Sequence, residues 1–289
     1  MTAPIAQFLA AGQQAGARYT LAAARRAPQG TAGVQLGRLA GDSMEFMDHR
    51  EYQPGDDLRR LDWAAYARSD KMIVKLFRQE VCPHLDLVID GSRSMNLDGT
   101  PKAGAALGVA AALATAASNA GHTHRAFITN RGCEAVGNGA ALPSVWEGIA
   151  FDSRQSPPEA FHTLPPRWQP HGIRVLVSDL LWLGDPLEML TVFSAGAAAV
   201  YVVEVLAAAD IEPEHHGNLR LVDSESDAAD DVFLDAAALA RYRSNVARHR
   251  DAWRRAARQV GALLVPLVAE RVACDWDLSP LVDAGILTL

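Results

Sequence analysis

After its first eighty residues the chain alternates short apolar runs with longer stretches of helical pattern, and this alternation restricts the possible folds more than any other feature. Residues 85–90 (LDLVID) form a nearly continuous apolar run, which is typical of a strand covered on both faces. Similar runs occupy 173–180 and 199–206, and helical patterns cover 102–121 and about 186–196. Because strand–helix–strand units cross over with one hand, this pattern predicts an α/β fold: an open, mostly parallel sheet with helices on both faces.

The remaining predicted elements are a hairpin and a C-terminal group. Residues 124–129 and 133–136 are separated by Asn-Arg-Gly, which favours a β-hairpin. The last third contains the apolar runs LRLVD and DVFLD, an arginine-rich helix over about 236–260, a strand at 262–269 and a short closing helix. The alanines and Trp253 predict the packed face of the arginine-rich helix, and its arginines predict a solvated face that could also contact an acidic partner.

The first eighty residues have a different character. Residues 1–40 look helical and then irregular, whereas the following residues are dense in charged and aromatic side chains around the turn signal PGDD. We therefore predict an N-terminal accessory region over 1–80 and a second domain over 81–289. The alternation of acids, arginines and aromatics in REYQPGDDLRRLDW predicts an ordered structural turn, with Asp57 and Arg59 partly buried and paired. The residues assigned to this motif are Arg50, Tyr52, Pro54, Gly55, Asp56, Asp57, Arg59, Asp62 and Trp63.

Composition limits the classes of partner. The 34 acidic and 27 basic side chains give a formal charge of −7, so no overall positive field favours nucleic acid or an anionic membrane surface. The longest apolar stretches are rich in alanine and glycine and do not predict a membrane span, and the first ten residues lack a signal-peptide pattern. The cysteines are far apart and form no C-x-x-C pair, which suits a reducing compartment. We therefore expect a cytoplasmic protein that binds no nucleic acid and does not insert into a membrane.

Side chains suited to metal chemistry follow two of the predicted strands. Asp90 ends the first apolar run and precedes Ser92 and Ser94, with Gly91 allowing a tight turn. Asp179 follows the run that would lie beside the first strand in a 3-2-1-4-5 order, and such sheets bind ligands beyond the carboxyl ends of their strands. Carboxylates mixed with hydroxyls suit one hard divalent cation, Mg²⁺ or Mn²⁺, rather than a soft metal.

Other interpretations of this site stay open. The serine hydroxyls could merely cap the following helix or its approach loop. A phosphoester hydrolase similar to the haloacid dehalogenases would need an aspartate at the position of Ser92 as its general acid. The chain has no G-x-x-x-x-G-K-[ST] loop, which argues against direct ATP hydrolysis.

Two further polar clusters favour structural interpretations. The acids of PGDD and Asp62 could form a nuclease-like cluster, but salt bridges to Arg59, Arg60 and Arg68 explain them better. The histidine pairs at 122 and 124 and at 215 and 216 have no convincing third ligand for zinc.

The motifs together resemble a known family. The segments EFMDHREYQPGDDLRRLDWAAYAR (45–68), VKLFRQE (74–80) and LVIDGSRSM (87–95) are similar to domain-of-unknown-function family fifty-eight, proteins with a von Willebrand factor A-like domain. The later VLVSDL and LRLVDSES segments follow the family's order, so the resemblance covers most of the chain from about residue 33. It implies a von Willebrand factor A-like, Rossmann-type topology for the second domain.

In that fold the D-x-S-x-S residues belong to a metal-ion-dependent adhesion site. The resemblance implies that Ser92 and Ser94 are direct hydroxyl ligands and that Asp90 and Asp179 hold the ion largely through water. A threonine from a middle loop normally completes this set. The corresponding loop here, FDSRQSPPEAFHT, has no threonine at the expected place, and the predicted substitute is Ser156, with Ser153 as second choice.

The resemblance also implies partners. Relatives are associated with MoxR-type AAA+ ATPases, so the expected partners are such an ATPase and a client protein. The expected function is a non-enzymatic, metal-dependent protein-binding adaptor in chaperone-like assembly or maturation of the client. The alternatives are a metal-dependent phosphoester hydrolase and an A-like domain whose metal site has decayed and which binds by surface shape.

Overall fold

The computed structural model describes residues 5–22, 44–54, 56–69, 71–79, 83–213 and 217–289. Contacts group residues 1–29 with 83–289 in one compact unit, and residues 30–82 form a second, smaller unit. The expected accessory region over 1–80 is therefore divided between the two units.

The N-terminal helix belongs to the larger unit because it packs against a central helix. Helix α1 (Ile5–Gly16) lies on α3 (Lys102–Asn119), and a Cβ added to Gly12 would meet the carbonyl oxygen of Gly108 at 2.3 Å. Glycine at position 12 is what permits the two backbones to approach so closely. Strand β1 (Thr20–Leu21) then pairs antiparallel with β12 (Leu287–Thr288) near the C-terminus.

A sheet of six strands within the described residues forms the centre of the larger unit, in the order β11-β8-β7-β4-β5-β6. All neighbouring strands are parallel except β5 and β6, which form the predicted antiparallel hairpin. The α/β fold with an open, mostly parallel sheet is therefore confirmed. The strands are β4 (His84–Asp90), β5 (Thr123–Thr129), β6 (Cys133–Ala135), β7 (Ile173–Ser178), β8 (Ala199–Leu206) and β11 (Leu263–Val268).

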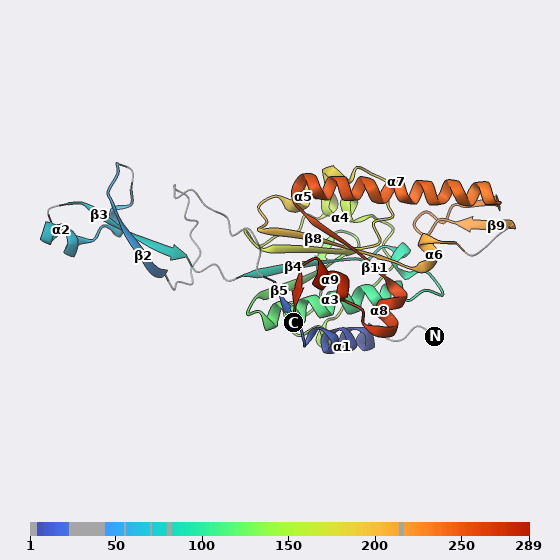
Figure 1. The fold of residues 1–289 in the computed structure, drawn as a ribbon, viewed down its shortest axis with the longest axis horizontal. Coiled ribbons are helices and arrows are strands. Elements are labelled where there is room, and N and C mark those ends of the chain that lie inside the picture. Colours follow the sequence, from blue (N-terminus) through green and yellow to red (C-terminus); the bar gives the residue numbers. More distant parts are fainter. Residues whose placement is uncertain (1–4, 23–43, 55, 70, 80–82, 214–216) are drawn as a thin grey trace. The chain divides into compact units, whose positions relative to one another are not determined.

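Helices cover both faces of this sheet, as predicted (Figure 1). One hydrophobic core joins the sheet to α1, α3, α8 (Ala269–Asp275) and α9 (Ser279–Asp283). A second core joins the opposite face to α4 (Pro157–Thr163), α5 (Pro186–Ser194) and α7 (Ala236–Val260). Successive strand residues point to opposite faces, so Leu87 packs in the first core and Val88 in the second. This double burial explains why the run at 85–90 is apolar throughout.

Shorter elements complete the larger unit. They are η2 (Arg93–Asn96), η3 (Pro143–Val145) and α6 (Ala208–Ile211). The two apolar runs of the last third pair as a separate antiparallel hairpin, β9 (Gly217–Val222) and β10 (Ala229–Leu234). None of the helices in the described ranges is both long enough and apolar enough to cross a membrane.

The smaller unit is built on two antiparallel strands, β2 (Met44–Glu51) and β3 (Ile73–Gln79). Between them lie η1 (Leu58–Arg60) and α2 (Trp63–Ser69). Asp62 is buried just before α2, where its Oδ1 accepts hydrogen bonds from two backbone N–H groups of the helix start. This arrangement is an N-cap, which satisfies backbone donors that the helix itself leaves unpaired.

The predicted pairing of Asp57 with Arg59 is wrong. Both side chains are exposed, and Asp57 Oδ1 instead accepts a 3.0 Å hydrogen bond from the backbone N–H of Arg59. A short acidic side chain in a tight turn bonds most easily to a backbone group two residues on, which explains the difference. An ion pair does form in this turn, between Arg50 and Asp56 at 2.8 Å.

The other motif residues are mostly local in their contacts. Asp62 is paired with His49 at 2.9 Å and lies 3.6 Å from Lys75 Nζ. The predicted salt bridges to Arg59 and Arg68 do not form within the described residues, and the Arg60 side chain lies outside them. The backbone N–H of Tyr52 donates to the carbonyl of Met72 at 2.9 Å. Trp63 is 65% exposed, and Gly55 lies outside the described residues.

Candidate functional site

The candidate site lies at the carboxyl ends of β4 and β7, which are neighbours as predicted. Strand β4 ends at Asp90 and β7 ends at Ser178, whose hydroxyl donates to Asp90 Oδ2 at 2.6 Å. Asp179 follows directly. The exposed fractions of Asp90 and Asp179 are 0% and 1%. Parallel pairing thus brings two carboxylates from distant sequence positions to one buried edge.

The loop after Asp90 turns back over the strand end. The backbone N–H of Ser92 donates to Asp90 Oδ1 at 2.9 Å, and the Ser92 and Ser94 hydroxyl oxygens lie 3.0 Å apart. A Cβ added to Gly91 would meet the carbonyl oxygen of Thr129 at 2.3 Å, so glycine is required by the neighbouring strand. Although Ser92 precedes η2, its side chain makes no capping hydrogen bond to that helix. The Ser92 hydroxyl therefore does not cap η2.

Thr129 is a member of the site that the sequence reasoning missed. It ends β5 in register with Asp90, and its hydroxyl accepts a 3.1 Å hydrogen bond from the backbone N–H of Gly91. The same hydroxyl lies 3.5 Å from Asp90 Oδ1. A hydroxyl residue at the end of the next predicted strand was the available signal, because parallel neighbours end at the same edge of a sheet.

Burial and like charge act together on Asp90. Burial in the sheet edge is the larger cause and the Asp179 carboxylate the second, and together they raise the pKa of Asp90 to about 6. Hydrogen bonds from Ser178 and Ser92 oppose this shift. Two buried carboxylates at one edge are costly unless a positive charge compensates them.

A lysine supplies part of that compensation. Lys102, at the start of α3, is 1% exposed, and its Nζ lies 3.0 Å from Asp179 Oδ2 and 3.0 Å from Asp210 Oδ2. Burial by itself would lower the pKa of Lys102, but the two aspartates outweigh it and raise the pKa above its ordinary value. Asp210 is fixed in turn by the backbone N–H of Ala207 at 2.9 Å. Neither Lys102 nor Asp210 was predicted, because nothing in their local sequence points to Asp179.

The middle loop approaches the D-x-S-x-S loop through Ser153. The two segments form a parallel bridge in which Ser153 N–H donates to the Gly91 carbonyl at 3.1 Å and Arg93 N–H donates to the Ser153 carbonyl at 3.0 Å. The Ser153 hydroxyl donates to the carbonyl of Asn130 at 2.8 Å. The Ser156 hydroxyl donates to Glu159 Oε2 at 2.9 Å, at the start of α4. Both candidate hydroxyls are thus bonded to groups other than the two buried aspartates.

The donor set fits a hard divalent cation. Its atoms are carboxylate and hydroxyl oxygens, with the excess negative charge buried at Asp90 and Asp179. The ammonium of Lys102 shows that this edge already holds a positive charge. No group of three or more His, Cys, Asp or Glu side chains is placed to hold a metal ion in the described ranges. Two carboxylates and hydroxyls are a different set, which suits an ion that keeps several water ligands.

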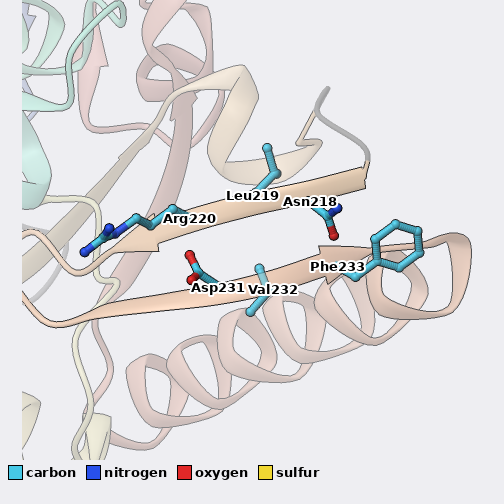
Figure 2. Close-up of a pocket in the computed structure, with 6 residues that line it drawn as sticks. All are labelled: Asn218, Leu219, Arg220, Asp231, Val232 and Phe233. Carbon is cyan, nitrogen blue, oxygen red and sulfur yellow. The ribbon is translucent and has the colours of Figure 1, made fainter.

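The other polar clusters of the described residues are weaker candidates for a binding site. His124 is bonded to the Ser118 hydroxyl and the Ala141 carbonyl, and burial lowers its pKa, while His215 and His216 lie outside the described residues. A hollow of about 470 Å³ lies on the β9–β10 hairpin, and Figure 2 shows the side chains that line it. Its lining includes one acid and one base, directly opposite each other in register, so it lacks a concentrated donor set. The lining residues are Asn218, Leu219, Arg220, Asp231, Val232 and Phe233.

The fold and the site define an α/β protein with an oxygen-rich, negatively charged edge beyond its central strands. The chain belongs to the family described as "Protein of unknown function DUF58", which matches residues 48–252. This assignment confirms the family suggested by the sequence motifs.

The names of the individual relatives state no activity. The chain is 29% identical over 266 residues to "Uncharacterized protein Rv1480" of Mycobacterium tuberculosis and to "Uncharacterized protein Mb1516" of Mycobacterium bovis, covering 84% of this chain and 80% of each relative. Among solved structures, a conserved hypothetical protein BatB from Bacteroides thetaiotaomicron matches 70% of this chain and 98% of its own, at 10% identity and a TM-score of 0.36. An aerotolerance-related membrane protein from Bacteroides fragilis matches 71% of this chain and 96% of its own, at 11% identity and a TM-score of 0.37.

Proposed function

We propose that this chain is a non-enzymatic adaptor that binds a partner protein through one divalent cation, Mg²⁺ or Mn²⁺, in a domain of the von Willebrand factor A type. The observation that carries this proposal is the pair of buried carboxylates, Asp90 and Asp179, beside the hydroxyls of Ser92 and Ser94. Ser92 and Ser94 would supply neutral oxygen ligands, and the aspartates would supply the compensating charge. When bound, the cation supplies a positive charge that attracts a carboxylate of the partner.

The proposed partner is a MoxR-type AAA+ ATPase, which acts with this chain on a client protein. The family resemblance supports this choice, and the absence of a phosphate-binding G-x-x-x-x-G-K-[ST] loop from the sequence is consistent with an ATPase as a separate chain. A carboxylate on the ATPase would gain its contact only when the cation is present. Binding is therefore expected to weaken on chelation.

The test is a titration of the purified ATPase from the same organism against wild type, Asp90→Ala and Ser92→Ala, with Mg²⁺ and with chelator. We expect each variant, and chelation of the wild type, to weaken binding at least about tenfold, which is roughly 1.4 kcal/mol. The exposed Asp230 of β10 provides a control, Asp230→Ala, that should bind normally. Equal affinities under all conditions would refute the cation bridge, and a Mg²⁺-dependent phosphoester turnover lost in Asp90→Ala would replace the adaptor with a hydrolase.

One observation favours a second candidate, a domain that binds its partner by surface shape without a cation. Lys102 already holds an internal positive charge against Asp179, so the site has a permanent substitute for part of an ion's charge. Under this candidate the wild type binds the ATPase equally well with and without chelator, and Mn²⁺ does not bind.

A further inference from the structure

The tip of the β9–β10 hairpin lies on the candidate site. This tip, residues 223–228, joins the two strands seen in Figure 2. Its Glu225 is half-buried, and Glu225 Oε1 accepts a 3.1 Å hydrogen bond from the backbone N–H of Ser94. Ser94 is the residue whose hydroxyl contacts Ser92, so the Glu225 carboxylate is held against the loop that carries the hydroxyl pair of the site.

Arginines hold the tip in this position. Arg93, between the two serines, donates to Asp227 Oδ1 at 3.1 Å and to the carbonyl oxygen of Ser224 at 3.5 Å. Arg154, from the middle loop, forms a second ion pair with Asp227. Arg93 and Arg154 thus form an arginine clamp that fastens the tip to both loops that border the site.

The tip carries three acidic residues, and their hydrogen bonds distinguish Glu225 from the other two. Asp223 bonds within the tip itself, where it accepts hydrogen bonds from the backbone N–H and hydroxyl of Ser226, and Asp227 pairs with the arginines. Glu225 Oε2 is oriented by the Ser224 hydroxyl at 2.6 Å. Of these three acids, Glu225 is the one that contacts the D-x-S-x-S loop.

The carboxylates around the D-x-S-x-S loop are not all paired with a positive side chain. Lys102 compensates Asp179 in part but makes no contact with Asp90 among the ion pairs of the described residues, and Glu225 brings a further carboxylate to the loop that follows Asp90. The arginines of the clamp pair with Asp227, not with Glu225. A carboxylate placed beside like charges is stabilised by a cation between them.

We propose that Glu225 is an intramolecular acidic ligand of the cation site, which takes the outward position until the carboxylate of a partner replaces it. This inference rests on the proposed function, because it assumes that the site binds a divalent cation. The arginine contacts are partly solvated, and exposed ion pairs of this kind contribute little to stability, so the tip can be displaced at small cost. The hairpin tip then supplies an internal ligand, Glu225, that leaves the cation when a partner carboxylate binds.

The test uses Mn²⁺ alone as the probe and the full-length chain. Binding is followed by electron paramagnetic resonance, and the water ligands of the bound ion are counted from water-proton relaxation. We expect Glu225→Gln to weaken Mn²⁺ binding about tenfold and to add about one water to the bound ion. Asp227→Asn, which loosens the clamp without removing the ligand, should weaken binding by a smaller factor. Asp230→Asn carries the same charge change on the same hairpin and should bind as wild type does.

The outcomes separate the two hypotheses. If the wild type binds Mn²⁺ and Glu225→Gln binds it with equal affinity and equal hydration, the role of Glu225 is refuted and the proposed function stands. If the wild type binds no Mn²⁺, both are refuted. If Asp230→Asn weakens binding as much as Glu225→Gln, the effect is one of general charge and the ligand assignment is also refuted.

Discussion

Asp90 in the larger unit and Asp62 in the smaller unit show two opposite uses of a buried aspartate. A hydrogen bond from the Ala65 backbone N–H is the main cause that lowers the pKa of Asp62 to about 2, with contributions from His49 and Lys75. Burial and the Asp179 carboxylate raise the pKa of Asp90 to about 6. The first carboxylate is satisfied by donors and cations that the fold supplies. The second lies beside another negative charge.

This difference separates a structural motif from a candidate binding site. Both segments are rich in polar residues in the sequence, and both contain aspartates close to a chain turn. In the smaller unit the acids cap a helix or pair with an arginine. In the larger unit they accumulate negative charge at a strand edge, which is typical of sites that receive a cation.

The largest expected effect is a loss of stability when the buried ammonium of Lys102 is removed from the larger unit. Lys102→Met leaves Asp179 and Asp210 buried without their partner, and breaking a buried ion pair costs about 3–5 kcal/mol. The free energy of unfolding, measured by urea denaturation in chelator, should fall by that amount, and Mn²⁺ should restore part of it. Lys71→Met, at an exposed position, is the control. An unchanged unfolding free energy would show that Lys102 does not compensate the site.

A second effect is a pH dependence that has opposite signs for the two aspartates. Because its folded-state pKa is raised from 3.8 to about 6, Asp90 favours the folded state most below 3.8, and this contribution is lost as the pH rises through about 6. Asp62 favours the folded state above 3.8, and its contribution is lost as the pH falls toward about 2.

We expect Asp90→Asn to remove a loss of stability on the order of 2 kcal/mol between about pH 4 and pH 7 in chelator. The measurement is urea denaturation of wild type and variant across this range. Parallel pH profiles for the two proteins would contradict the predicted role of Asp90. Added Mn²⁺ should reverse the loss in wild type only.

A smaller and more local effect is expected in the smaller unit. Asp62→Ala removes the N-cap of α2 and the contact with His49, so amide hydrogen exchange between residues 56 and 79 should accelerate. Asp57→Ala, at an exposed position, should accelerate exchange less. Mn²⁺ affinity should be the same in both variants as in wild type. A loss of Mn²⁺ binding in Asp62→Ala would break the distinction between the two regions.

The smallest effect is expected for Ser156, the predicted substitute for the missing threonine. Its hydroxyl is bonded to Glu159, so Ser156→Ala should cost about 1 kcal/mol through loss of that hydrogen bond. Mn²⁺ affinity should change by less than about twofold, because a single hydrogen bond elsewhere leaves the aspartates in place. A tenfold loss of Mn²⁺ affinity would instead establish Ser156 as a ligand.

Much of the larger unit could be predicted from local pattern. The helix over 236–260 is α7, from Ala236 to Val260, and the apolar runs at 85–90 and 199–206 are central strands. The turn predicted around PGDD is present before η1, but the pairing predicted within it is not. Pairing in a tight turn depends on which backbone N–H lies within reach of each carboxylate, and sequence spacing does not determine that.

The amino-acid pattern was enough to predict the fold class and the aspartates that follow β4 and β7, because strand periodicity and crossover handedness restrict the topology strongly. The predicted pairing of β4 with β7 also required a 3-2-1-4-5 strand order, and the structure has these two strands as neighbours. Only the tertiary structure placed Lys102 and Asp210 against Asp179 and the Glu225 carboxylate against Ser94. These contacts join residues far apart in the chain, from a helix start, a short helix and a hairpin tip. These side chains meet because of how the elements pack around the carboxyl ends of the strands, and that packing cannot be predicted from residue types and local spacing.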